Sequence, residues 1–114
     1  MKIVVAGPRD LFNQGIVDAA IEQSGFHVTE IIHGDCSGVD RMAEVWARRH
    51  GIPVRRFPAA WKLYGKSAGP IRNRTMANHG DALVAVYGTT RGTADMVRAM
   101  TEAGKPVSIY KRDA

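Results

Sequence analysis

The chain has 114 residues, of which 45% are apolar and 24% are charged, and its formal net charge is +5. This length and composition are typical of one soluble globular domain, and we expect a single domain over residues 1–114. The lack of an 18-residue apolar run excludes a membrane-spanning helix, and the apolar run near the N-terminus is too short for a signal peptide. We therefore predict a cytoplasmic protein.

Cys36 is the only cysteine, which excludes an internal disulfide. The four histidines are scattered and show no metal-binding spacing, so we expect neither a metal site nor a cofactor. For His33 we favour a hydrogen-bonded core residue over a ligand contact. The basic charge indicates either a solvated surface or attraction to an anionic partner such as a nucleotide or a nucleic acid.

Strand-like and helix-like segments alternate along the chain, each helix being followed by a glycine or ending at one. In chain order we predict a strand over residues 2–6, a helix over 13–24, a strand over 29–33, a helix over 39–50, a strand over 53–57, a helix over 70–79, a strand over 81–87, a helix over 93–103 and a strand over 106–110. We expect the tail, residues 111–114, to be frayed.

Such alternation predicts an α/β fold, because consecutive parallel strands need crossover helices. We expect a three-layer domain with a mostly parallel sheet of about five strands and helices on both faces. In sheets of this kind ligands bind beyond the carboxyl ends of the strands. The loops that follow the strands are therefore the place to look for a site.

The first two of these loops are rich in glycine. Gly7 permits a tight turn or the close approach of a ligand, and Arg9 can bind a phosphate, although an exposed arginine in a plain turn is equally compatible. In the second loop Gly34, Ser37 and Gly38 precede a helix, whose free N–H groups would form an anion site. Alternatively, Ser37 only caps that helix. The pattern is neither a Walker P-loop nor a nucleophile elbow.

The third loop, over residues 57–73, is the longest irregular stretch. It contains Pro58 and Trp61, whose ring can stack on a base, and Lys66, which can bind a phosphate. A hydrophobic segment that packs on its own domain is the alternative. Arg72 and Asn73 come at the start of the next helix, and we expect their side chains to face the cleft.

The fourth loop contains Gly88, Arg91 and Gly92, with Thr93 near a helix N-cap, and it is the strongest single candidate for a phosphate loop. Four loops of this composition converge on one edge of the sheet, which favours a nucleotide-binding cleft. The candidate ligand-binding residues are Gly7, Arg9, Gly34, Ser37, Gly38, Asp40, Pro58, Trp61, Arg72, Asn73, Gly88, Arg91, Gly92 and Thr93.

Together these loops resemble the SLOG superfamily, specifically its YspA/cpYpsA-related branch. The residues that carry the resemblance are Gly7-x-Arg9, residues 33–40, Phe57-Pro58-Ala59-x-Trp61, Tyr64-Gly65, Ala68-Gly69-Pro70-x-Arg72-Asn73-x-x-Met76 and Arg91-Gly92-Thr93-x-x-Met96. The resemblance implies a Rossmann-like fold, an origin in bacteria or phages, and ligands such as nucleotides or NAD- and ADP-ribose-type molecules.

The superfamily also includes the LOG phosphoribohydrolases, which cleave the N-glycosidic bond of nucleoside monophosphates and carry the signature PGGxGTxxE. Here Met96 stands at the position of the acidic residue, and a thioether cannot accept a proton. Arg72 matches the position of a functional arginine in those enzymes. Asp40 and Asp95, and less so Asp35, remain as candidates for acid–base chemistry.

We therefore expect binding of a nucleotide or nucleotide-derived ligand, such as an ADP-ribose or NAD derivative or a cyclic nucleotide, by a protein that senses, carries or sequesters it. The first alternative is an N-glycosidic hydrolase or transferase of LOG type. Nucleic-acid binding ranks third, prompted by the net charge and by DNA-processing relatives in the superfamily. We expect no membrane partner and a homo-oligomer, in which a neighbour's Trp61 loop can complete the site.

Overall fold

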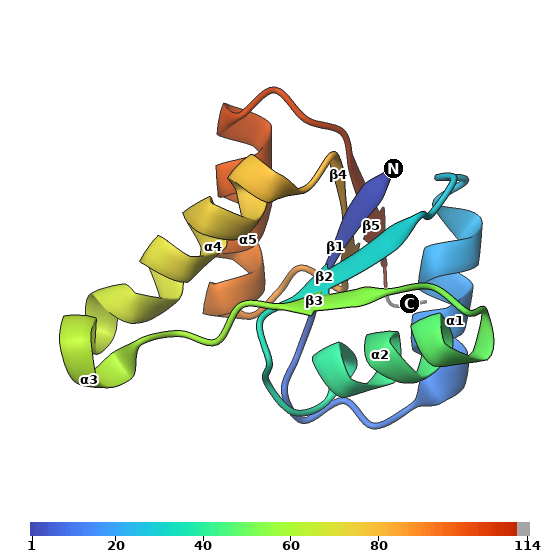
Figure 1. The fold of residues 1–114 in the computed structure, drawn as a ribbon, viewed down its shortest axis with the longest axis horizontal. Helices are drawn as coiled ribbons and strands as arrows, with labels where there is room; N and C mark the ends of the chain where they lie inside the picture. Colours follow the sequence, from blue (N-terminus) through green and yellow to red (C-terminus); the bar gives the residue numbers. More distant parts are fainter. Residues whose placement is uncertain (112–114) are drawn as a thin grey trace.

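The computed structural model describes residues 1–111, so all of the predicted frayed tail except Lys111 lies outside the described residues. Five parallel strands form one sheet in the order β3-β2-β1-β4-β5, which confirms the predicted α/β fold (Figure 1). The elements are β1 (Lys2–Ala6), α1 (Gln14–Gln23), β2 (Glu30–His33), α2 (Val39–Arg49), β3 (Val54–Arg56), α3 (Trp61–Tyr64), the 3₁₀ helix η1 (Gly65–Ser67), α4 (Ala68–His79), β4 (Ala82–Val86), α5 (Arg91–Glu102) and β5 (Val107–Tyr110).

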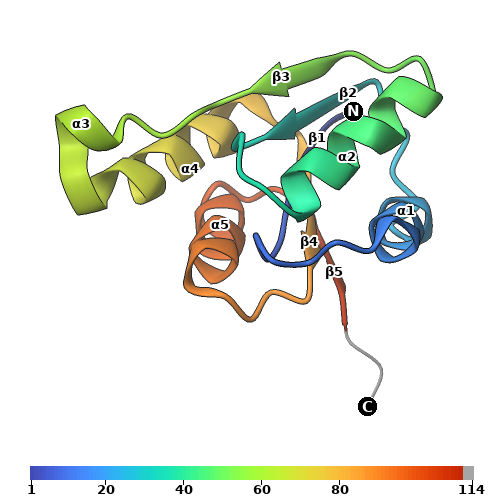
Figure 2. The ribbon, with the colours of Figure 1, turned by 90° about the horizontal axis from the view of Figure 1, so that it is seen from below.

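Helices cover both faces of the sheet, with α1 and α2 on one side and α4 and α5 on the other (Figure 2). Because successive side chains of a strand point to opposite faces, one strand can contribute to the apolar cores on both faces of the sheet. In β1, Ile3 and Val5 pack with α1 and α2, whereas Val4 packs with α4 and α5. Every residue of β4 is buried, as expected for a strand covered on both faces. Within residues 1–111, no helix has the length and apolar character needed to cross a bilayer.

The strand order changes direction between β1 and β4, and this position determines where a crevice can open. After β1 and β2 the chain passes through α1 and α2 on one face, and after β4 it passes through α5 on the other face. The loops that follow neighbouring strands β1 and β4 therefore diverge at the carboxyl edge of the sheet. Such a switch point is where open α/β sheets bind ligands.

Two predicted helix starts are wrong. Helix α4 begins at Ala68 and not at Pro70, and residues 61–67 form α3 and η1 where we expected an irregular loop. Pro70 is accommodated in the first turn of α4, where its missing N–H has no intrahelical partner to lose. Helix α5 begins at Arg91, because Thr90 and not Thr93 is its N-cap: Thr90 Oγ1 accepts the N–H of Thr93 at 3.3 Å.

The C-terminal end of α4 is held by a lysine from the loop before β5. Lys105 Nζ lies 2.6 Å from the carbonyl oxygen of Ala77, 3.3 Å from that of Asn78 and 2.7 Å from that of Gly80. A cation at the last carbonyl groups of a helix satisfies them and complements the helix dipole. This contact helps to fix α4 relative to α5.

We predict that Lys105→Met lowers the free energy of unfolding by about 1–3 kcal/mol, because three carbonyl oxygens lose a charged donor. Urea unfolding followed by circular dichroism measures the change. Lys111→Met, at an exposed lysine that holds no helix end, serves as the control and should change stability by less than about 0.5 kcal/mol. Equal stability of the two variants would contradict a capping role for Lys105.

Candidate functional site

A pocket of about 510 Å³ opens at the carboxyl edge of the sheet. The loops after β1, β2 and β4 and the N-terminal turns of α4 and α5 form its walls, and its volume suits a small organic ligand. Most of the predicted site residues line it, namely Gly7, Arg9, Gly34, Asp40, Trp61, Arg72, Asn73, Arg91, Gly92 and Thr93. Ser37, Gly38, Pro58 and Gly88 do not line it.

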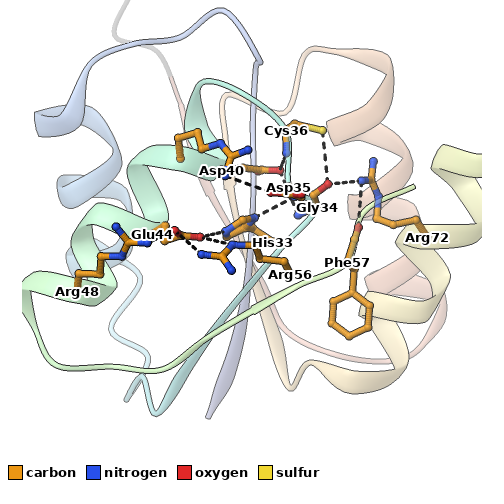
Figure 3. A network of polar contacts seen from close by, with 11 residues as sticks. His33, Gly34, Asp35, Cys36, Asp40, Glu44, Arg48, Arg56, Phe57 and Arg72 are labelled. Carbon is orange, nitrogen blue, oxygen red and sulfur yellow. Dashed lines mark hydrogen bonds and ion pairs between the residues drawn. The ribbon is translucent and has the colours of Figure 1, made fainter. Parts of the chain in front are cut away.

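In the loop before α2, where we predicted an anion site, the protein supplies a carboxylate of its own. The Asp40 Oδ2 atom accepts the N–H groups of Gly34 and Cys36, both at 3.1 Å (Figure 3). The N–H of Asp35 is bonded to His33 Nδ1 at 2.9 Å. Three donors of this loop are thus used within the chain.

Glycines in the first two loops are required by packing between the loops. Gly38 has φ +69°, and a Cβ there would lie 2.4 Å from the carbonyl oxygen of Arg9. A Cβ at Gly7 would lie 2.7 Å from Val39 Cγ2. Ser37 does not cap α2, since its Oγ donates to the Arg9 carbonyl at 3.0 Å and Gly38 is the N-cap. Three of the residues predicted to bind ligand, Gly7, Ser37 and Gly38, therefore join the first loop to the second.

Arg72 connects α4 to the loops after β2 and β3. Its Nη1 donates to the carbonyl oxygens of Gly34 at 2.7 Å and Phe57 at 3.4 Å, and its Nε donates to Asn73 Oδ1 at 3.0 Å (Figure 3). A Cβ at Gly34 would lie 2.5 Å from Arg72 Nη1, so only glycine permits this approach. Arg72 faces the pocket, as predicted, and also braces its wall.

Asp95 joins α5 to α4 at the pocket. Its Oδ2 accepts Asn73 Nδ2 at 2.9 Å and Arg74 Nη1 at 3.0 Å, and Arg98 lies 3.7 Å from its Oδ1. Asn73 Nδ2 also donates to the Gly92 carbonyl at 3.3 Å. The Asp95 carboxylate is thereby compensated by two guanidinium groups before any ligand enters.

The first turn of α5 offers free donors to the pocket. Thr90 and Thr93 bond to each other, with 2.7 Å between their Oγ1 atoms. The N–H groups of Arg91 and Gly92 have no hydrogen-bond partner within residues 1–111. The first N–H groups of a helix favour anions. In this predicted phosphate loop, the N–H groups of Arg91 and Gly92 are therefore available to bind one.

Ion pairing divides the arginines of residues 1–111 into two groups. Arg9, Arg72 and Arg91 form no ion pair with a carboxylate of the described residues, and all three line the pocket. Lys66, a further pocket residue, is also without such a pair. The arginines that do pair with a carboxylate are Arg41, Arg48, Arg49, Arg55, Arg56, Arg74 and Arg98. The arginines of residues 1–111 that have no carboxylate partner among these residues thus all line the pocket.

Burial raises the pKa of Asp40, against the opposing effects of His33, the Cys36 N–H group and Arg72.

A second buried carboxylate, Glu44, lies outside the pocket. Its hydrogen bonds with Arg56 are the main reason that the pKa of Glu44 falls to about 2. Glu44 accepts two bonds from Arg56, at 2.7 and 2.8 Å, and one from His33 Nε2 at 2.8 Å (Figure 3). His33 is thus a satisfied core histidine.

Several pocket residues were not among the predicted ligand-binding residues. Asp10 was not singled out at all, whereas Gly69 and Met76 were named only within the motif that carries the family resemblance. Thr90 could have been found, because a threonine directly before a helix start is a typical N-cap. Met96, which stands at the position of the acid in LOG enzymes, lines the pocket and is 1% exposed. Within residues 1–111 no group of three or more His, Cys, Asp or Glu side chains could hold a metal ion.

Two comparisons place the chain among known proteins. The model of the YspA, cpYpsA-related SLOG family matches residues 1–64. The gene 61 protein of Mycobacterium phage D29 is 33% identical over 84 residues, which cover 68% of this chain and 67% of the phage protein. The family match includes the loops after β1 and β2 and ends in α3, so Arg72 and Arg91 lie beyond it.

We predict that Glu44→Gln lowers the free energy of unfolding by roughly 2–3 kcal/mol at neutral pH. Because the pKa of Glu44 is lowered to about 2 by folding, its contribution is complete above its ordinary pKa and disappears as the pH falls toward 2. Urea titrations between about pH 2 and 7 should therefore show the two proteins converging at the acid end. Glu22→Gln, on an exposed face of α1, is the control, and a gap independent of pH would contradict the assignment.

Proposed function

The chain belongs to the YspA, cpYpsA-related SLOG family, and we propose that it binds a nucleotide or nucleotide-derived ligand in this pocket. The ligands we consider are ADP-ribose or NAD derivatives and cyclic nucleotides. In this proposal the protein senses, carries or sequesters the ligand.

The main support for the proposal is that the arginines without a carboxylate partner in the described part of the chain line the pocket. Arg9, Arg72 and Arg91 approach the pocket without carboxylate partners among residues 1–111. Next to Arg91, the free N–H groups at the start of α5 add oriented donors. Guanidinium groups and helix N-termini are the groups with which proteins commonly bind phosphate. A phosphate or pyrophosphate at this end of the pocket satisfies both.

An apolar wall provides a place for a base. Trp61 is half exposed and lines the pocket, and its ring lies within 3.5 Å of where a Cβ of Gly69 would be. The ring of Trp61 thus lies beside the first turn of α4. Met76 and Met96 form apolar surface in the same pocket. A flat heterocycle can stack on the indole and contact the thioethers.

The contacts of the pocket carboxylates favour binding over N-glycosidic hydrolysis. Met96 lines the pocket where LOG enzymes have an acid, and neighbouring Asp95 is already bound by Asn73 and Arg74. Nucleic-acid binding through the exposed arginines of α2 and β3 has less support, because those side chains are paired with carboxylates. The pocket cations have no such partner.

Isothermal titration with AMP, cyclic AMP, ADP-ribose and NAD tests the proposal. We predict that Arg91→Ala weakens binding of the ligand roughly ten- to a hundredfold, because a charge-assisted contact contributes about 1.5–3 kcal/mol. Arg41→Ala is the matched control, since Arg41 is exposed and paired with Asp35 at 3.1 Å outside the pocket, and it should bind as the unchanged protein does. Absence of heat with every nucleotide would count against the proposal.

The role of Trp61 gives a separate prediction. Trp61→Ala should weaken binding of adenosine phosphates about five- to a hundredfold, because stacking on an aromatic ring contributes about 1–3 kcal/mol per base. Ribose 5-phosphate has no base, so Trp61→Ala should not change its affinity. Competition titrations with both compounds measure the difference. An equal loss for both would place Trp61 at the phosphate and not at the base.

A further inference from the structure

The feature that the proposed function leaves unexplained is a carboxyl group in a pocket for anions. Asp40 is 6% exposed and lines the pocket together with Arg9, Arg72 and Arg91. An ionised carboxylate in a pocket repels a phosphate, and this repulsion strengthens when the ligand displaces water. A protonated carboxyl removes the repulsion and becomes a hydrogen-bond donor.

The two carboxyl oxygens of Asp40 differ in their hydrogen bonds. Oδ2 accepts both loop N–H groups, from Gly34 and Cys36. No hydrogen bond to Oδ1 occurs within residues 1–111, and Oδ1 is not among the buried side-chain atoms that are shut off from solvent without a partner. The loop is therefore held by one oxygen, and the other can gain a proton without breaking either bond.

The neighbouring charges leave Asp40 without a strong partner. The guanidinium of Arg72 acts electrostatically on Asp40, but its Nη1 donates to the carbonyl oxygens of Gly34 and Phe57. His33 contacts Glu44 through Nε2 and the N–H of Asp35 through Nδ1, so neither ring nitrogen bonds to Asp40. The other charged or titratable groups around Asp40 or in the same pocket are Asp35, Cys36, Arg41, Arg9, Asp10, Lys66, Arg91 and Asp95.

We propose that an anionic ligand binds in this pocket together with a proton, which Asp40 takes up from solvent on Oδ1. The inference rests on the proposed function and names how that site responds to pH. By linkage, the affinity for an anion increases as the pH falls through the titration of Asp40, and it decreases up to about tenfold for each pH unit above it. The ligand class this favours is one that keeps its full negative charge at the lower pH, such as a pyrophosphate diester.

ADP-ribose is the probe, because its pyrophosphate remains ionised near neutral pH and does not take up or release a proton on binding. Titrations at one pH, in buffers that differ in protonation enthalpy, measure the proton uptake as the slope of the observed heat against that enthalpy. The expected slope corresponds to uptake of up to one proton for the unchanged protein and to none for Asp40→Asn, whose amide oxygen can still accept the two loop N–H groups. A zero slope for the unchanged protein, or a slope lost in Asp10→Asn and kept in Asp40→Asn, overturns the inference.

A second measurement uses the unchanged protein alone and therefore does not depend on the folding of any variant. The ¹³C resonance of the Asp40 carboxyl, followed against pH, gives the pKa of Asp40 with and without inorganic sulfate. The expected result is a higher pKa in sulfate, and an unchanged pKa overturns the inference. Binding of ADP-ribose without proton uptake leaves the proposed function intact and removes the inference. If sulfate raises the pKa of Asp40 but no nucleotide binds, the inference stands and the proposed function is removed.

Discussion

The site depends on the hydrogen bonds that the Asp40 carboxylate accepts from the loop after β2. These bonds fix the loop so that the Gly34 carbonyl meets Arg72 at 2.7 Å. Arg72 in turn bonds to Asn73, and Asn73 bonds to Asp95 on α5. One continuous series of polar contacts thus runs along the pocket from α2 through α4 to α5. Helices from opposite faces of the sheet, which contribute to separate apolar cores, are therefore coupled at the pocket.

The fold was largely predictable because its signals are local. Each strand is a short apolar run, and each crossover helix shows its own periodicity, so order and direction followed from the alternation. The errors arose where a tertiary contact overrides a local signal. Gly69-Pro70 suggested a helix start at Pro70, yet α4 begins at Ala68. Trp61 belongs to the short helix α3, and its ring lies beside Gly69.

The position of the pocket could be predicted from the sequence, and the contacts of its residues less so. The arginines could be identified, since their place after strands puts them at the carboxyl edge. The glycines were ambiguous, because a glycine that admits a phosphate looks the same in a sequence as one that admits a neighbouring segment. Gly7 faces Val39, and Gly38 faces the Arg9 carbonyl. Likewise nothing in the local pattern reveals that Asp40, six residues after Gly34, would occupy the donors of an apparent anion loop.

The distribution of ion pairs also bears on how fast a ligand can be captured. Charges that are matched by a close opposite charge contribute little to the field at a distance, whereas unmatched charges around a concave opening reinforce one another. If the pocket binds an anion as we propose, the guanidinium groups of Arg9, Arg72 and Arg91, which have no carboxylate partner among the described residues, would steer diffusing anions toward it. This guidance extends over about 8–10 Å at physiological ionic strength, which makes encounter rates sensitive to the salt around the protein.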